Sequence, residues 1–211
     1  MDLIDVLVWL GTLTFAITGA LVAVRKRFDL VGVVVLGAVT AIGGGSVRDL
    51  MAGVIPPSTL TDPAILWGIV SAAFAVFFIH RFIAEGAVFY ILDTVGLAVF
   101  ATLGAERALE LGFGFWGTVF AGVLSGVGGG VIRDVLSGEV PGILYRSGDF
   151  YATAAAAGAA VAYLLVPVNA DLGLAAGIGV ALLLRIGSRL ADLSLPVPRQ
   201  TPESDTADAL D

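Results

Sequence analysis

Apolar residues gather in seven long blocks that alternate with short polar links. The blocks cover residues 3–24, 30–54, 64–84, 87–108, 115–138, 149–166 and 171–190. A block of about 18 to 25 apolar residues is long enough to cross the hydrocarbon core of a bilayer as a helix. The links carry charges and helix breakers, among them Arg25-Lys26-Arg27, Pro56-Pro57 and Pro141-Gly142. The pattern therefore predicts an all-α membrane protein with seven transmembrane helices.

An internal repeat relates the first three blocks to the next three. Residues 11–57 align without a gap to residues 96–142, at an offset of 85 residues, and 17 of 47 positions are identical. Each copy holds three spans, an odd number, so the second copy enters the membrane from the opposite side, as an inverted repeat. The expected organisation is a first three-helix repeat at 1–86, a second, inverted repeat at 87–168, a seventh helix at 169–191 and a polar acidic tail at 192–211, which is expected to be disordered.

Composition excludes several classes of protein. Hydrophobic residues make up 58% of the chain and charged residues 14%, and the mean hydropathy is +0.98. A soluble domain of this length needs far more polar surface. Cysteine is absent and His80 is the one histidine, which removes thiolate chemistry and most histidine-based metal or triad schemes. We expect no enzymatic activity, no cofactor, no metal site and no nucleic-acid partner.

Basic residues predict the orientation in the membrane. If the N-terminus is outside, eight basic residues lie inside and Arg107 alone lies in an outer link. The eight are Arg25, Lys26, Arg27, Arg81, Arg146, Arg185, Arg189 and Arg199. Because cytoplasmic loops carry an excess of lysine and arginine, we expect a multi-pass protein of the cell membrane with its N-terminus outside and its C-terminus in the cytoplasm.

The second and fifth blocks each contain Gly-Gly-Gly-x-x-Arg-Asp. The triplets are Gly43, Gly44, Gly45 and Gly128, Gly129, Gly130. Each glycine costs a helix roughly 1 kcal/mol relative to alanine, so a kink or an unwound segment is expected. Freed backbone groups must face protein or a water-filled cavity. Two such breaks in inverted halves indicate a permeation or binding site. The alternative is that the glycines let helices pack closely.

The arginine and aspartate of each motif are expected within the membrane, near the path. A charge there costs at least about 2.5–3.5 kcal/mol, so Arg48 and Arg133 need partners. Asp49 directly follows Arg48, and Asp134 directly follows Arg133. Neighbouring side chains on a helix point about 100° apart, however, so the pair within one motif is poorly aligned. Pairing across the two copies, Arg48 with Asp134 and Arg133 with Asp49, is an alternative. The sequence supports two roles for the Arg-Asp pairs equally, a structural ion pair that locks two helices and a direct role in permeation.

Three further polar residues are candidates for the same site. Thr40 and Ser125 occupy the same repeat position, three residues before the glycines. Their hydroxyls either line a polar path or bond back to a carbonyl of the preceding turn, and back-bonding is favoured. Asp93 lies in the fourth block, and its repeat equivalent is Val8, so this carboxylate belongs to one half only.

The paired glycine motifs, the Phe-Ala-x-x-Gly-Ala of the first and fourth blocks and the three-plus-three-plus-one layout resemble the prokaryotic trimeric intracellular cation (TRIC) channel family. The same sequence domain is also called a glycine transporter domain. The resemblance covers residues 3–190. It implies a homotrimer in membrane lipid, with an hourglass-shaped pore for monovalent cations, chiefly potassium, in each protomer. It also implies that the two glycine triplets are kink residues of the pore-lining second and fifth helices.

Two functions therefore remain open on the sequence. The first is a channel for monovalent cations. The second is a secondary transporter for a small solute such as glycine, because inverted repeats with broken central helices suit alternating access equally well. A membrane protein without transport does not account for two intramembrane Arg-Asp pairs.

Overall fold

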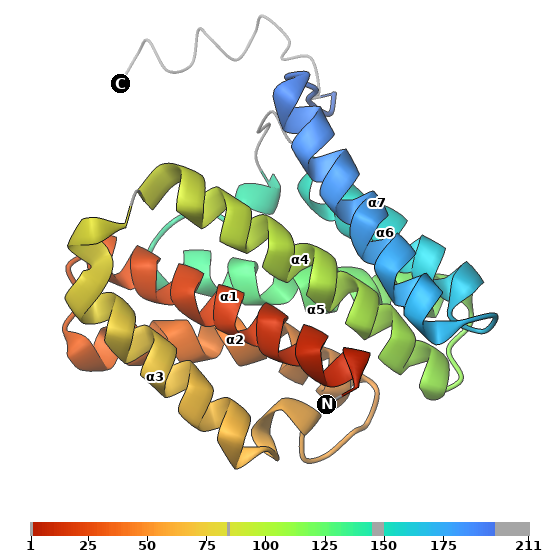
Figure 1. Ribbon diagram of the computed structural model, residues 1–211, viewed down its shortest axis with the longest axis horizontal. Helices are drawn as coiled ribbons and strands as arrows, with labels where there is room; N and C mark the ends of the chain where they lie inside the picture. Colours follow the sequence, from red (N-terminus) through yellow and green to blue (C-terminus); the bar gives the residue numbers. More distant parts are fainter. Residues whose placement is uncertain (1, 84, 145–149, 197–211) are drawn as a thin grey trace, which may run out of the picture.

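Seven α-helices form the part of the chain that the computed structural model describes, residues 2–83, 85–144 and 150–196 (Figure 1). They are α1 Leu3–Arg25, α2 Leu30–Met51, α3 Pro63–Ile79, α4 Glu85–Glu110, α5 Phe115–Leu136, α6 Tyr151–Leu165 and α7 Ala170–Leu190, with short 3-10 helices η1 Ser58–Leu60, η2 His80–Phe82 and η3 Gly142–Leu144. Each predicted block contains one helix, which confirms the predicted fold class. Arg146, Arg199 and residues 197–211 of the predicted tail lie outside the described residues.

The outer surface of the bundle is apolar, as a bilayer requires. Six of the seven helices are long and apolar enough to cross a membrane, and α6 is a shorter apolar helix of 15 residues. Large side chains that a soluble protein would bury point outward, including Trp67, Trp116, Phe82 and Leu183. An exposed apolar surface of this extent marks contact with lipid or with other membrane chains. The protein is a multi-pass membrane protein.

The internal repeat extends to the loops. Each copy consists of two long helices, a 3-10 helix and a third helix. The first loop of each copy turns at a residue with positive φ, Arg27 (61°) and Gly112 (79°), and the second turns at Gly53 (75°) and Gly138 (73°). Both pairs are 85 residues apart. These left-handed residues end the helices, so α2 stops at Met51, three residues before the predicted limit.

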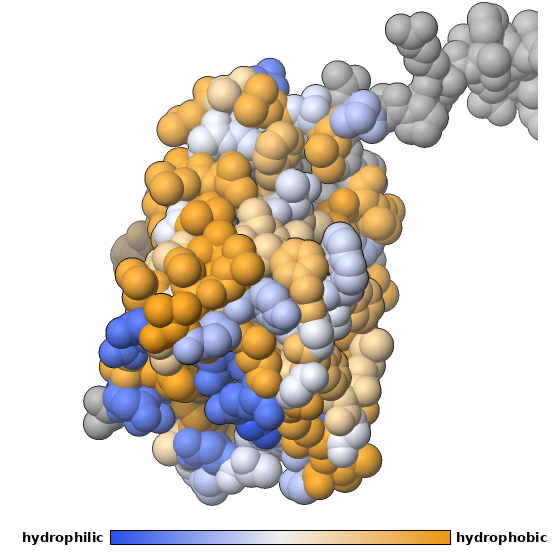
Figure 2. All heavy atoms as spheres, turned by 90° about the vertical axis from the view of Figure 1, so that its right-hand side faces the viewer, coloured by the Kyte–Doolittle hydropathy of each residue, from blue (hydrophilic) through white to orange (hydrophobic). Residues whose placement is uncertain are grey.

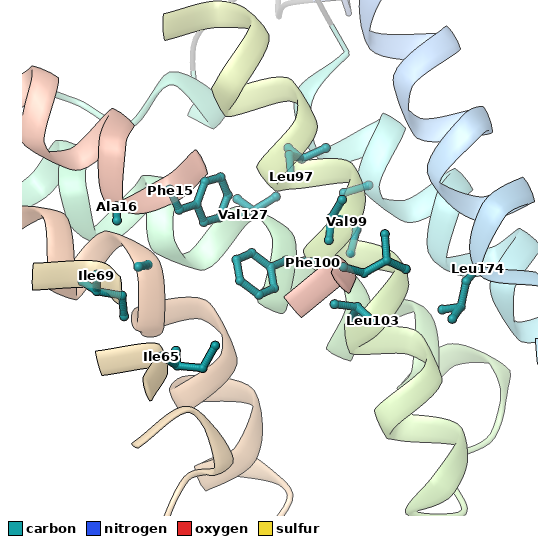
Figure 3. Packing of buried hydrophobic residues seen from close by; sticks show 14 residues of the cluster. Phe15, Ala16, Ile65, Ile69, Leu97, Val99, Phe100, Leu103, Val127 and Leu174 are labelled. Atoms are coloured by element: carbon teal, nitrogen blue, oxygen red, sulfur yellow. The ribbon is translucent and has the colours of Figure 1, made fainter. Parts of the chain in front are cut away.

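Helices α1 and α4 lie side by side at the centre, α2 and α5 lie behind them in Figure 1, and the pair α6–α7 and helix α3 lie at opposite sides. The rings of Phe15 and Phe100, equivalent residues of the two copies, lie 5.3 Å apart. Figure 3 shows them beside Val127 of α5. Both rings are almost completely buried. The core therefore closes where the two copies meet.

Candidate functional site: two cavities at a helix crossing

Four of the six triplet glycines, Gly43, Gly44, Gly128 and Gly129, form the contact between α2 and α5, whereas Gly45 and Gly130 face Thr59 and Tyr151. A Cβ atom built on Gly44 would lie 3.0 Å from the carbonyl carbon of Ser125 and closer still to its oxygen, and one on Gly129 would overlap the carbonyl oxygen of Thr40. A Cβ on Gly128 would lie 3.0 Å from the Cα of Gly44. The backbones thus touch with no side chain between them.

Both helices run without interruption through their triplets. The predicted unwound segment is therefore wrong, while the kink stays a prediction. The close approach of the two backbones supports the alternative of close helix packing. The sequence argument counted the helix propensity lost at each glycine. It gave too little weight to the packing that the missing side chains allow, as at small-residue crossings of membrane helices.

Two cavities open on either side of this crossing. We call them the N-terminal cavity, of about 340 Å³, and the C-terminal cavity, of about 300 Å³. The N-terminal cavity is lined by the start of α1 and the end of α4, whereas the C-terminal cavity is lined by the end of α1 and the start of α4. They have no lining residue in common. The chain therefore encloses two opposed hollows, closed from each other at the crossing.

Arg48 lies at the inner end of the N-terminal cavity and is 8% exposed. Its Nε and Nη2 donate to Oδ1 of Asp49 at 2.9 and 2.7 Å, and its Nη1 donates to Oγ of Ser125 on α5 at 3.1 Å. The sequence argument considered the pair within one motif poorly aligned. The long guanidinium folds back far enough to make it.

Arg133 takes the equivalent place in the C-terminal cavity, but it has a different set of partners. Its Nε donates to Asp134 at 2.9 Å and its Nη1 donates to Oδ1 of Asp93 at 2.8 Å. Arg185 of α7 donates to the other oxygen of Asp93 at 2.6 Å. Asp93 is 1% exposed and joins two arginines. The predicted pairs between copies, Arg48 with Asp134 and Arg133 with Asp49, are wrong.

The motif aspartates also hold the loops that follow their helices. Oδ2 of Asp49 accepts hydrogen bonds from the backbone N–H and the hydroxyl of Ser58, at 2.8 and 2.6 Å. Oδ2 of Asp134 accepts one from the N–H of Gly142 at 3.2 Å. Each motif aspartate therefore fixes the loop that follows its helix, α2 or α5, to the end of that helix. This is the structural role that was one of the two predicted for the Arg-Asp pairs.

Thr40 and Ser125 differ despite their equivalent positions. The hydroxyl of Thr40 donates to the carbonyl of Leu36 at 2.6 Å, which confirms the expected back-bonding. Ser125 instead accepts from Arg48. Gly19 and Gly104, the glycines of the Phe-Ala-x-x-Gly-Ala segments, leave room for these two side chains. The hydroxyls thus stabilise the crossing.

An ion-pair cluster closes the rim of the C-terminal cavity. Lys26 and Arg25 contact Oε1 of Glu139 at 2.9 and 3.3 Å. These contacts tie the loop after α1 to the loop after α5. The hydrogen bond from Lys26 and the two positive charges lower the pKa of Glu139.

Arg185 and Glu106 are cavity residues that were not predicted as site residues from the sequence. Arg185 was treated only as a sign of orientation, although an arginine between Leu184 and Ile186 inside an apolar block is itself evidence of an intramembrane partner. Glu106 lies near the end of the predicted fourth block and was not considered as a site residue, and α4 continues past it to Glu110. Both residues line cavities.

Comparison with known proteins places this arrangement in a family. A sequence model described as glycine transporter matches the chain twice, at residues 5–81 and 90–167. A structure determined to explain conductance through TRIC cation channels is 37% identical and superposes with a TM-score of 0.87, covering 95% of this chain and 99% of the other. The chain belongs to the TRIC family. Its membership confirms the resemblance drawn from the paired motifs.

Other similar proteins match over most of the chain. The Rhodobacter sphaeroides orthologue of the trimeric intracellular cation channel is 40% identical, with a TM-score of 0.85 over 92% of this chain and 100% of the other. A UPF0126 membrane protein of Deinococcus radiodurans is 49% identical over 196 residues, 92% of this chain and 91% of its own. The inner membrane protein YadS of Escherichia coli K12 is 38% identical over 192 residues, 88% and 91% of the two chains.

Proposed function

We propose that the protein is a channel for monovalent cations, chiefly potassium, and that each protomer of a homotrimer holds its own pore. One observation carries the proposal: two cavities, each with charged residues in an otherwise largely apolar lining, enter the protomer from opposite ends and stop at the crossing of α2 and α5. The structures that superpose on the chain are described as TRIC cation channels and as a trimeric intracellular cation channel. Both descriptions support a cation channel.

The crossing is the proposed gate. Gly44 and Gly129 bring two backbones into contact, so a small separation of α2 and α5 would join the cavities. Phe15 and Phe100 pack beside the crossing and exclude water from it. In this proposal both triplets, Gly43–Gly45 and Gly128–Gly130, are pore residues. Gly43, Gly44, Gly128 and Gly129 set the distance between the helices, and Gly45 and Gly130 line the two cavities.

Carboxylates balance the arginines at the ends of the cavities. Arg48 is paired with Asp49, and Arg133 is paired with Asp93 and Asp134. A bare arginine beside the path would repel a cation, since charges in a low-dielectric wall interact strongly. The pairing reduces that barrier and holds the helix ends that frame the gate. Structural and pore-adjacent roles are therefore compatible.

The proposed orientation is N-terminus outside and C-terminus in the cytoplasm. Of the basic residues that the sequence assigns to the cytoplasm, Arg25, Arg185 and Arg189 line the C-terminal cavity. The N-terminal cavity would then face outward. Lipid and neighbouring protomers would cover the exposed apolar surface. The repeat limits 1–86 and 87–168, with a seventh helix at 169–191, remain predictions.

Recording from the purified protein in planar bilayers tests this proposal. We expect unitary current steps whose reversal potential, in a potassium chloride gradient, lies close to the potassium equilibrium potential. Protein-free bilayers and a chain with a leucine at both Gly44 and Gly129 are the controls. Side chains at both glycines block the crossing, so the doubly substituted protein should insert but carry little current. A reversal potential near that of chloride would overturn the proposal.

Secondary transport of a small solute such as glycine is the second candidate. It is favoured by the separation of the two cavities, since alternating access requires a site closed to one side at a time, and by the description of the matching sequence model. Saturable glycine counterflow into vesicles without current steps would support a carrier. Current steps without counterflow would support the channel.

A further inference from the structure

The N-terminal cavity has two carboxylates, those of Asp62 and Glu106, that form no ion pair with a described arginine or lysine. Its charged lining residues are Arg48, Asp62, Glu106, Arg107 and Glu110. Asp49 forms an ion pair with Arg48 at 2.7 Å, and Glu110 forms one with Arg107 at 2.6 Å. Glu106, which is half-buried, makes no ion pair among the described residues.

The neighbours of Glu106 make this carboxylate a cation acceptor. Glu110 lies one turn further along α4, and like charges four residues apart on a helix repel. Asp62 accepts a hydrogen bond from the N–H of Ala64 at 2.8 Å and caps α3, so its charge faces a helix N-terminus. A cation beside Glu106 would relieve the repulsion without displacing an existing ion pair.

The remaining walls of the N-terminal cavity are apolar. Ile4, Val8, Ile42, Ile65, Phe100 and Leu103 line it. A volume of about 340 Å³ falls within the range of small-molecule pockets, which are mostly apolar with a few polar groups that fix orientation. Figure 2 shows the side of the molecule on which α4 ends, where hydrophilic residues gather among apolar ones.

The opposite cavity lacks this combination. The repeat equivalent of Glu106 is Leu21. Arg25, Arg133, Arg185 and Arg189 all line the C-terminal cavity. Its carboxylates Asp93, Asp134 and Glu139 each contact an arginine, so among the described lining residues a carboxylate without a basic partner belongs to the N-terminal side only.

We propose that the N-terminal cavity binds an organic ammonium ion, a primary amine with a short apolar tail. The ammonium group donates to the carboxylate of Glu106, and the tail packs against Ile65, Phe100 and Leu103. An ammonium carries three donors and no acceptor, so it matches a site whose free group is an acceptor. The neutral alcohol of the same length lacks the charge, and the carboxylate of the same length has the wrong sign.

Direct binding tests the site without any measurement of ion flux. The full-length protein in detergent is titrated with n-hexylammonium, n-hexanol and n-hexanoate in a calorimeter, at mildly alkaline pH and low salt. We expect saturable binding of n-hexylammonium that Glu106→Gln weakens at least about tenfold, because a charge-assisted hydrogen bond is lost. Glu139→Gln makes the same change at the rim of the other cavity and should leave the affinity unchanged.

Three results would overturn the inference. They are no saturable binding of n-hexylammonium, equal affinity in the wild type and Glu106→Gln, or n-hexanol binding as tightly as the amine. Glu106→Gln removes a like-charge repulsion, so it should melt at or above the wild-type temperature, and its melting curve shows that the variant is folded. If the protein carries no current but still binds the amine through Glu106, only the proposed function fails.

Discussion

Adding a single methyl group at the α2–α5 crossing should destabilise the protein. In Gly44→Ala the new Cβ would lie 3.0 Å from the carbonyl carbon of Ser125 and closer to its oxygen, and in Gly129→Ala it would lie 3.3 Å from the carbonyl carbon of Thr40. Carbon–oxygen contacts between helices normally lie at about 3.3–3.6 Å. Both obstacles are backbone, so neither can move aside as a flexible side chain would. Accommodating either methyl group therefore requires a shift of the backbone around it, which costs free energy.

The magnitude follows from two opposing terms. Overpacking of this kind costs about 1–3 kcal/mol, and replacing glycine by alanine inside a helix returns about 0.8–1.0 kcal/mol. The two terms leave a net loss of about 0–2 kcal/mol, and because both obstacles are backbone atoms we expect the upper half of that range, about 1–2 kcal/mol, for each variant. The two substitutions act on one contact, so the double variant should lose less than the sum of the two single losses.

Thermal unfolding of the purified protein in detergent measures the effect. Gly179→Ala is the matched control, because a Cβ at that helical glycine meets nothing within 4 Å. This control should be neutral or slightly stabilising. If Gly44→Ala and Gly129→Ala melt like Gly179→Ala, the crossing is not closely packed and the interpretation of the triplets is refuted.

Three other predictions concern charge and topology. Asp93→Asn leaves Arg133 and Arg185 without their shared carboxylate and should lower the free energy of unfolding by about 3–5 kcal/mol. Asp134→Asn should lower it less, since the side chain of Asp134 is 13% exposed against 2% for Asp93. Equal losses of stability in the two variants would argue against the cluster. Lys26 and Arg25 lower the pKa of Glu139. The ion pairs of Glu139 therefore stabilise the fold by about 0–1 kcal/mol above the usual carboxyl pKa, and this stabilisation is lost as the pH falls through the lowered pKa. The melting temperature of Glu139→Gln should decline less in acid than that of the wild type, and parallel curves would contradict this. In a chain without native cysteine, Thr61→Cys should react with an impermeant thiol reagent outside intact cells and Ala191→Cys should not, whereas the reverse labelling pattern would invert the orientation.

The helices and their repeat were predictable because membrane insertion imposes a strong pattern. Apolar blocks of fixed length identify spans, and Arg-Asp, Phe-Ala and Gly-Ala recur at one offset through both copies. The ends were less accurate because the loop glycines Gly53 and Gly138 stop helices inside blocks that remain apolar. Hydropathy alone carries no signal for such a left-handed turn.

The ion pairs were not predictable in the same way. Arg185 reaches Asp93 across 92 residues of sequence, and the internal repeat gives no signal for this pair because α7 has no repeat counterpart. The choice between Asp49 and Asp134 as the partner of Arg48 depends on side-chain rotamers rather than on helix position. The predicted unwinding failed because propensity describes an isolated helix, whereas Gly44 and Gly129 face another backbone.

The central claim is that cations cross each protomer through both cavities, and cysteine modification during bilayer recording tests it most directly. Thr59→Cys lies in the N-terminal cavity and Val140→Cys in the C-terminal cavity, and Thr61→Cys, outside the N-terminal cavity lining, is the control. A bulky cationic thiol reagent should reduce the current of Thr59→Cys only from the N-terminal side and that of Val140→Cys only from the opposite side, while Thr61→Cys keeps its current. Full current after complete modification of both cavity cysteines would contradict the account.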